Sequence, residues 1–173
     1  KKLKHLSEIY NSYDTFLIDL WGVMHNGVKL YPEAMTVIEN LNKLKKKIVF
    51  LSNAPRPSAN IIDFLQKLKI DKKYLQNVLT SGEAALNYLK KEHGLKKFDH
   101  VGPPRDFDLF EDFKDYKSDN IDDSEYLLCT GLFDEQATDL KYYKNLLEKH
   151  LKKKMICTNP DLIVDRGNRR DLC

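Results

Sequence analysis

The sequence lacks the features that mark several common protein classes. No apolar run approaches the length that crosses a membrane, and the first ten residues, KKLKHLSEIY, contain no apolar stretch of the kind found in secretory signal peptides. Only three cysteines occur, Cys129, Cys157 and Cys173, and they are widely spaced with no CxxC pair. These absences favour three reduced thiols over a zinc site or disulfides, and they predict a cytoplasmic protein without a membrane partner.

A strong charge of one sign is also missing. The 173 residues include 29 lysines and arginines against 26 aspartates and glutamates, so the net charge is only +3. This balance gives no indication of a nucleic-acid partner. Apolar residues make up 42% of the chain, which is enough for one large domain or for a core with a smaller partner.

What is present is a regular alternation of short apolar runs and amphipathic stretches. Three runs are too short for helices and indicate buried strands: TFLIDL, KIVFLSN and NVLTSG. Helices are expected after them, in YPEAMTVIENLNKLKKK, in SANIIDFLQKLKI and in EAALNYLKKEHG, the last with Gly94 as its C-cap. This order predicts an α/β fold built on a doubly wound parallel sheet, with strands buried on both faces.

The composition of the sequence changes near Lys97. The segment KFDHVGPPRDFDLFEDFKDYKSDNIDDSE is acidic, aromatic and rich in loops. Two further strands are expected in YLLCTG and KKMICTN, on either side of a helix in QATDLKYYKNLLEKHL. We therefore predict two domains, residues 1–96 and a smaller α/β domain over residues 97–173.

Each expected strand of the first domain ends in polar or small residues: Asp19, Ser52 with Asn53, and Thr80 with Ser81 and Gly82. Ligands of open parallel sheets bind at the carboxyl ends of the strands, so we expect these residues to lie close together. Helix capping is an equally simple explanation for the serines and threonine. It explains Asp19 poorly, because no helix begins directly after it and a buried carboxylate needs a partner.

A carboxylate in this position can attack phosphorus and form an aspartyl-phosphate. Such a reaction needs a hard cation, usually Mg²⁺, to screen the two anions. It also needs hydrogen-bond donors for the phosphoryl oxygens, which Ser52, Asn53 and the turn at Gly22 could supply. Glycine also lets the backbone approach a phosphate closely.

Four motifs together resemble the haloacid dehalogenase-like hydrolases of subclass IIA. DLWGVMHNG is similar to their first motif, Asp-x-Asp-Gly-Thr/Val, and VFLSNAPRPS to the Ser/Thr-Asn form of the second. LTSGEAALNYL looks like the third-strand segment, and CTNPD like the Thr-Asn-x-Asp of the cap region. The resemblance implies the first half of a Rossmann-like core with an inserted α/β cap domain. It also implies a phosphatase of small phosphorylated metabolites such as sugar phosphates, nucleotides, pyridoxal phosphate or p-nitrophenyl phosphate.

The resemblance also implies roles for individual residues. Asp19 would be the nucleophile and a Mg²⁺ ligand, and the backbone carbonyl of Trp21 a second ligand. Ser52 would bind the phosphoryl group with Asn53 beside it. Arg56 is near enough in the sequence to contact an anionic substrate, or is a solvated loop residue.

In the cap region, Asn159 and Asp161 would contact the substrate. An Asn-Pro turn closed by an Asx hydrogen bond explains these two residues equally well.

Two departures from the family pattern bear on activity. The family places its general acid and base two residues after the nucleophile, where this chain has Trp21, whose indole N–H only donates. His25 is the nearest titratable group, although we favour an exposed loop residue for it. The family's later Lys and its acidic pair on a fourth strand have no counterpart, and Asp122 with Asp123 do not replace that pair by order.

The second departure predicts a truncated gene product or a fragment. A sheet of three strands would leave a strand edge and an apolar face exposed, which a homodimer could cover. Three functions follow: a Mg²⁺-dependent phosphatase acting through Asp19; a degenerate relative without hydrolase activity that binds or assembles only; and a receiver or nucleotide-binding module. The third is disfavoured, because no acidic cluster is visible near the first strand.

Overall fold

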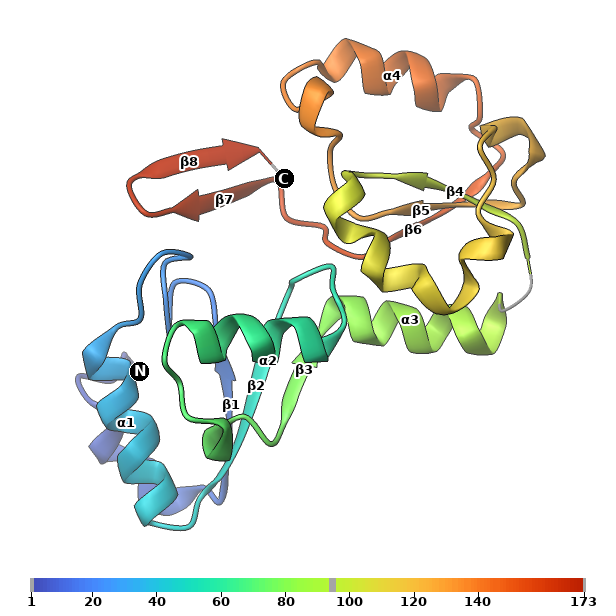
Figure 1. Ribbon diagram of the computed structural model, residues 1–173. Coiled ribbons are helices and arrows are strands. Elements are labelled where there is room, and N and C mark those ends of the chain that lie inside the picture. The colour runs from blue at the N-terminus through green and yellow to red at the C-terminus, as the bar shows by residue number, and fades with distance from the viewer. Residues whose placement is uncertain (1, 94–95, 173) are drawn as a thin grey trace. The chain divides into compact units, whose positions relative to one another are not determined.

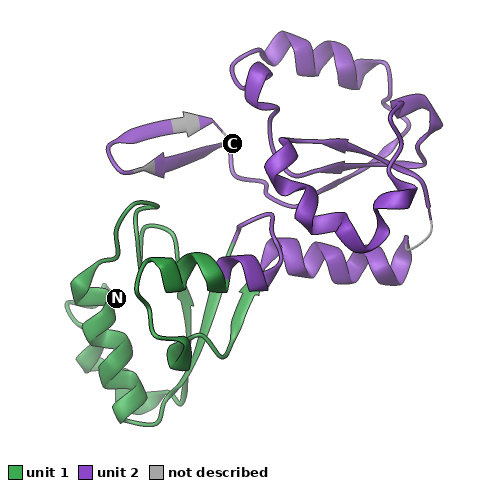
Figure 2. Ribbon diagram, in the orientation of Figure 1, with its two compact units in different colours: residues 1–52, 62–79 green, residues 53–61, 80–173 purple. Residues whose placement is uncertain are grey.

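The computed structural model describes residues 2–93 and 96–172. It has an α/β fold with parallel sheets, which confirms the broad form of the predicted fold class. The contacts divide the chain into two compact units, shown in Figure 2. Unit 1 holds residues 1–52 and 62–79, and unit 2 holds residues 53–61 and 80–173. The division into domains at residue 96 stays a prediction.

Unit 1 is built on a sheet of order β1-β2-β3 (Figure 1). Strands β1 and β2 run parallel, with Asp19 paired to Leu51. The elements of this part of the chain are β1 (Thr15–Asp19), α1 (Pro32–Lys43), β2 (Lys47–Ser52), α2 (Ser58–Lys67) and β3 (Val78–Thr80), with short 3-10 turns at Leu6–Glu8, Tyr10–Ser12 and Lys72–Tyr74. All three strands predicted for the first half of the chain are present.

The helices α1 and α2 cover one face of this sheet. Helix α1 begins at Pro32, whose missing N–H costs nothing in a first turn, and it buries Ile38 and Leu41. It contacts β2, whose Ile48 and Phe50 are buried. Crossovers between parallel strands are right-handed. When successive strands are added in one direction along a sheet, as in β1-β2-β3, the helices that connect them therefore lie on the same face.

The opposite face of this sheet is exposed in the described part of the chain. Leu17 on β1 is 67% exposed and Leu79 on β3 is 54% exposed, and Leu51 on β2 is also exposed. The prediction that these strands are buried on both faces is therefore wrong. Strand β1 is an edge strand whose residues alternate between exposed and half-buried, because no described helix covers its outer side. The exposed apolar face expected of a sheet with three strands is present.

Unit 2 contains a second parallel sheet of order β4-β5-β6. In Figure 1, α4 lies on one side of this sheet, and α3 and η4 lie on the other. An aromatic and aliphatic core fills the second side: Leu86, Leu89, Phe98, Leu109, Phe110, Phe113, Tyr126 and Leu128. Its elements are α3 (Ser81–Glu92), β4 (Phe98–Val101), η4 (Pro104–Tyr116), η5 (Ile121–Asp123), β5 (Tyr126–Cys129), η6 (Asp134–Gln136), α4 (Leu140–Glu148), β6 (Lys154–Cys157), β7 (Ile163–Arg166) and β8 (Arg169–Leu172).

The sequence predictions for this unit are confirmed for β5, α4 and β6. They missed β4, which lies in the segment assigned to loops, and the antiparallel pair of β7 and β8. Helix α3 begins at Ser81, two residues before the predicted start, and Gly94 lies outside the described residues. Across residues 2–93 and 96–172, no helix has both the length and the apolar character that a membrane span requires.

Candidate functional site

Asp19 and Ser52 lie at the same edge of the first sheet. Asp19 is the last residue of β1 and is exposed, and Ser52 ends β2 one residue beyond the partner of Asp19, Leu51. The Oδ1 atom of Asp19 accepts a hydrogen bond from the N–H of Leu20 at 2.8 Å. The carboxylate is thus oriented by its own backbone at the carboxyl end of a parallel strand, where open sheets bind ligands.

A tight loop follows Asp19. The carbonyl of Leu20 accepts from the N–H groups of Met24 at 2.8 Å and of His25 at 3.2 Å, while the side chains of Leu20 and Met24 are buried. Gly22 has φ +77° and donates its N–H to the carbonyl of His25 at 2.8 Å. Its N–H is therefore used inside the loop. Apart from Gly22 itself and its two chain neighbours, no atom of the described residues lies within 4 Å of the place where a Cβ of Gly22 would stand. This glycine therefore leaves open space beside the loop.

Trp21 is half-buried and packs against the same loop. A Cβ on Gly27 would collide with the indole ring, so the ring lies directly on this glycine. The rings of Trp21 and His25 meet edge to face, with centroids 5.3 Å apart. Trp21 is thus fixed by packing at the position where the resemblance expects an acid.

His25 is buried between aromatic rings, with 2% of its surface exposed. The ring of Phe64 lies on it with centroids 5.3 Å apart, as does that of Trp21. Its Nδ1 accepts the N–H of Gly27 at 3.0 Å, and burial lowers the pKa of His25 below its ordinary value, partly offset by the charge of Asp19. The interpretation of His25 as an exposed loop residue is wrong, because the loop folds back and encloses it. Its Nδ1 acts as an acceptor, so the ring is neutral.

The other residues named from the sequence lie in unit 2, beginning with the segment that follows Ser52. Gly82 allows this segment to pack on the start of α3, since a Cβ on Gly82 would collide with the backbone of Arg56. The hydroxyl of Thr80 donates to the carbonyl of Arg56 at 2.6 Å and accepts from the N–H of Glu83 at 2.9 Å. The hydroxyl of Ser81 donates to the carbonyl of Ala54. Thr80 is therefore a helix cap, the simpler of the two readings of its position.

Arg56 is paired with a buried carboxylate. Its Nε lies 3.3 Å from Oδ1 of Asp106, and its Nη2 donates to the carbonyl of Arg105 at 3.2 Å. Asp106 is 4% exposed; burial raises its pKa, and the hydrogen bond and charge of Arg56 act in the opposite direction. Arg56 therefore compensates a buried acid and is not a freely solvated loop residue.

Asn53, Asn159 and Asp161 form one hydrogen-bonded group. The Nδ2 of Asn53 donates to both carboxylate oxygens of Asp161 at 3.2 Å. The Oδ1 of Asn159 accepts from the N–H of Asp161 at 3.0 Å, which is the Asx bond expected of an Asn-Pro turn. The structure thus brings Asn53 and the two cap-region residues together within unit 2.

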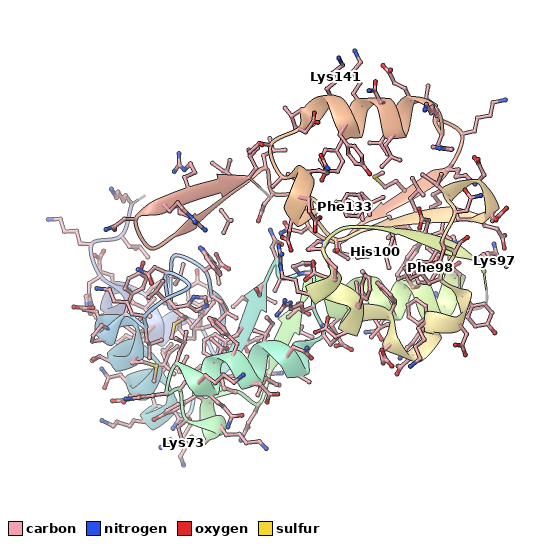
Figure 3. The ribbon with its side chains drawn as sticks, turned by 45° about the horizontal axis from the view of Figure 1, so that its top comes forward. Lys73, Lys97, Phe98, His100, Phe133 and Lys141 are labelled. Carbon is pink, nitrogen blue, oxygen red and sulfur yellow. The ribbon has the colours of Figure 1, made fainter. Side chains whose placement is uncertain are left out.

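Sequence reasoning missed a buried polar pair at the carboxyl end of the second sheet. His100 on β4, labelled in Figure 3, is 6% exposed, and its Nε2 lies 2.8 Å from Oγ1 of Thr130, which directly follows β5. Thr130 also bonds the carboxyl of Asp106. Burial lowers the pKa of His100 to about 4. The signal was the run from Phe98 to Val101, whose apolar ends were overlooked in an acidic segment.

The residues around Asp19 fit a Mg²⁺ ion in one respect. Among the described residues, no group of three or more His, Cys, Asp or Glu side chains gathers to hold a metal. Mg²⁺ usually keeps several waters and takes only one or two carboxylates together with substrate phosphate. An exposed carboxylate at a strand end, as in Asp19, suits that kind of binding.

Comparison with protein families gives one match. The profile of a family described as haloacid dehalogenase-like hydrolase matches residues 16–114, which is more than half of the chain. No curated protein sequence matches.

Several solved structures are similar to this chain. A hydrolase of the haloacid dehalogenase-like family from Brucella suis 1330 is 25% identical with a TM-score of 0.88, over 99% of this chain and 63% of that one. A 4-nitrophenylphosphatase from Thermotoga maritima is 19% identical with a TM-score of 0.68, over 95% and 61%. A glycerol phosphate phosphatase from Mycobacterium tuberculosis, solved in complex with calcium, is 16% identical with a TM-score of 0.66, over 95% and 47%. The chain therefore spans less than two thirds of the length of these proteins.

Proposed function

The chain belongs to the haloacid dehalogenase-like hydrolases, subclass IIA, and on that premise we propose that it is a cytoplasmic Mg²⁺-dependent phosphatase of a small phosphorylated metabolite. One observation carries the proposal: Asp19 stands exposed at the carboxyl end of β1, held by the N–H of Leu20, with Ser52 at the same edge. In this proposal residues 1–96 form the first half of a doubly wound Rossmann-like core, and residues 97–173 form its α/β cap domain.

The names of similar proteins support the substrate class. One is a 4-nitrophenylphosphatase and another a glycerol phosphate phosphatase, and both act on small phosphate esters by name. We extend that class to this chain. Asn159 and Asp161 would contact the substrate from the cap, and Arg56 would contribute positive charge near an anionic group while it holds Asp106.

The chemistry follows from the carboxylate of Asp19. One of its oxygens attacks the phosphorus of the ester, the bond from phosphorus to the leaving oxygen breaks, and the phosphoryl group remains on Asp19. Water then attacks this aspartyl-phosphate, releases inorganic phosphate and restores the carboxylate. Ser52 would donate its hydroxyl to the phosphoryl oxygens, and the open space beside Gly22 would admit the group close to the backbone.

Asp19 and the backbone carbonyl of Trp21 would hold Mg²⁺, which when bound screens the repulsion between the carboxylate and the phosphate. The other ligands of such an ion would be waters and the substrate.

The weak step is the transfer of protons. Trp21 only donates, and the Nδ1 of His25 is occupied by the N–H of Gly27 in a buried ring. General acid–base help is worth roughly 10²–10⁴-fold. Leaving groups that depart as stable anions, such as p-nitrophenolate, need no proton, whereas alcohols do. We therefore expect rapid transfer from p-nitrophenyl phosphate to Asp19, followed by slow attack of water.

The lack of a proton carrier at Trp21 and His25 favours one second candidate function. A family member in which Trp21 replaces the proton carrier and His25 is enclosed would bind phosphorylated ligands, or assemble with other chains, without hydrolysing anything. This candidate and the phosphatase differ in whether Asp19 becomes phosphorylated.

The test measures p-nitrophenolate released by the purified chain with and without Mg²⁺. We expect a burst of up to one equivalent per chain that requires Mg²⁺, then slow turnover. Asp19→Asn should abolish both phases. The matched control is Asp14→Asn, because Asp14 lies directly before β1 with a fully exposed side chain paired to Lys46, and it should leave both phases unchanged. Release that survives in Asp19→Asn would refute the nucleophile. A folded wild-type chain that releases nothing would favour the second candidate.

A further inference from the structure

Two cysteines that are far apart in the sequence are neighbours in the second sheet. Cys129 is the last residue of β5 and Cys157 is the last residue of β6, and the two are register partners in parallel strands, which lie side by side in Figure 1. Paired residues of neighbouring strands point to the same face and lie about 4.8 Å apart. Disulfides join residues whose Cα atoms are about 4.4–6.8 Å apart, so the backbone brings both thiols within reach of a bond.

The two thiols also interact directly. Burial raises the pKa of Cys129 to about 12, and the charge of Cys157 acts in the same direction, against a hydrogen bond from Cys129 to the carbonyl of Gly131. Cys157 is exposed and Cys129 is half-buried, and both are free thiols in the structure. The Sγ of Cys157 also donates to the carbonyl of Asn159 at 3.1 Å. Cys157 is therefore accessible to reagents in solution, and Cys129 is the neighbouring thiol that could react with it next.

We propose that Cys129 and Cys157 form a reversible disulfide that links the carboxyl ends of β5 and β6. The sequence favoured three separate reduced thiols, because the spacing of 28 positions between these two gives no sign of a pair. The inference goes beyond the proposed phosphatase activity and does not depend on it, since it rests on the register of the sheet and on the exposure of Cys157.

The oxidant in this proposal is a small disulfide such as oxidised glutathione. The thiolate of Cys157 attacks one sulfur of glutathione disulfide, forms a mixed disulfide and releases one glutathione thiolate. The thiolate of Cys129 then attacks the sulfur of Cys157, the mixed disulfide breaks, and the second glutathione thiolate leaves. Each cysteine gives up one proton, and the protein loses the two electrons that glutathione gains.

The bond would act on the loops that carry the cap-region residues. Thr130, which contacts His100 and Asp106, directly follows Cys129. Cys157 lies two residues before Asn159, where the turn begins in which Asp161 accepts hydrogen bonds from Asn53.

The experiment uses the full chain with Cys173→Ser, which leaves Cys129 and Cys157 as its only thiols. The folded protein is incubated with glutathione disulfide at several pH values. Free thiols, intact mass and linked peptides are then measured. We expect loss of both thiols and of two hydrogen atoms, one linked pair of peptides within a single chain, and full reversal by dithiothreitol. Closure should speed up about tenfold per pH unit, because Cys129 becomes reactive only as its thiolate forms.

Two variants in the same background isolate the steps. With Cys129→Ser, the reaction should stop at glutathione bound to Cys157. With Cys157→Ser, the half-buried Cys129 should stay reduced. The proposal is overturned if the two-cysteine chain ends as glutathione adducts, if the link forms between two chains, or if both thiols persist in folded protein under conditions that oxidise the chain unfolded in urea.

Discussion

Trp21 stands at the position where the resemblance to the family expects a general acid and base. Its side chain packs against Gly27 and the ring of His25, so these contacts hold it in place within the loop after β1. An indole cannot take a proton from water or deliver one to an alkoxide and then recover it. We therefore expect Asp19 to gain a phosphoryl group more easily than it loses one.

Restoring an acid tests this account at the scale of one side chain. Trp21→Asp should speed the slow phase of p-nitrophenyl phosphate turnover by about 10²–10⁴-fold, and it should extend activity to glycerol phosphate, whose leaving alcohol needs a proton. Trp21→Asn has nearly the same shape and leaves the same hole beside Gly27, but it transfers no proton. Equal rates in the two variants would show that the missing acid is not what limits turnover.

His100 makes stability depend on pH. Its pKa is about 4 in the folded chain against an ordinary value of 6.5, so between these values the unfolded chain binds more protons. Stability should therefore fall as pH drops from 6.5 to 4, by up to about 3 kcal/mol from this residue. Unfolding by urea across this range measures the effect.

His100→Gln serves as the control for that measurement. The amide can keep the hydrogen bond to Thr130, but it does not titrate. The stability of the variant should change less with pH than that of the wild type, and the difference isolates His100 from Asp99 and Asp106, whose raised pKa values act in the opposite direction. Parallel pH curves for the two proteins would contradict the assignment.

At the scale of elements, the first sheet has one covered face and one exposed face. Helices α1 and α2 follow successive strands in one direction and so pack on the side of Ile48 and Phe50. Leu17 and Leu79 stand on β1 and β3 with most of their surface exposed. A patch of this kind favours association.

We expect the chain to self-associate through this face. Leu17→Lys combined with Leu79→Lys should shift the chain toward monomer in sedimentation velocity at micromolar concentration, because charges on the face oppose its burial. Val28→Lys is the matched control, since Val28 is also largely exposed but lies in the loop before α1. Unchanged association in the double variant, or an equal shift in the control, would rule this face out.

The elements also show what the sequence could predict. Periodicity identified β1, β2, β3 and the helices between them, because short apolar runs and spacings of three and four are local signals. Periodicity could not show that one face of β1 is exposed, since the burial of a strand depends on what covers the sheet. Strand β4 was missed because its four residues include Asp99 and His100. His100 is buried by the rings of Phe107 and Phe110 and bonded to Thr130, thirty residues away, and none of these contacts is visible in the local pattern.

At the scale of the whole molecule, local sequence patterns again predicted only part of the candidate site. Asp19 and Ser52 are the last residues of neighbouring strands, so their meeting at one edge was predictable from the order of elements. The partners of Arg56, Asn53 and Cys129 were not, because they are Asp106, Asp161 and Cys157, which only tertiary structure brings near. Local motifs pointed to Asp19 as the candidate nucleophile, and the contacts that hold the other residues came from the fold.

The central claim is that Asp19 accepts a phosphoryl group, and rapid-quench mass spectrometry tests it most directly. The chain is mixed with p-nitrophenyl phosphate and Mg²⁺, quenched in acid within the burst and digested, and each peptide is weighed. The account predicts one added phosphoryl group on the peptide that carries Asp19, labile to hydroxylamine, lost in Asp19→Asn and kept in Asp14→Asn. Release of p-nitrophenolate with no phosphoryl group on that peptide, or with the group on another residue, would contradict it.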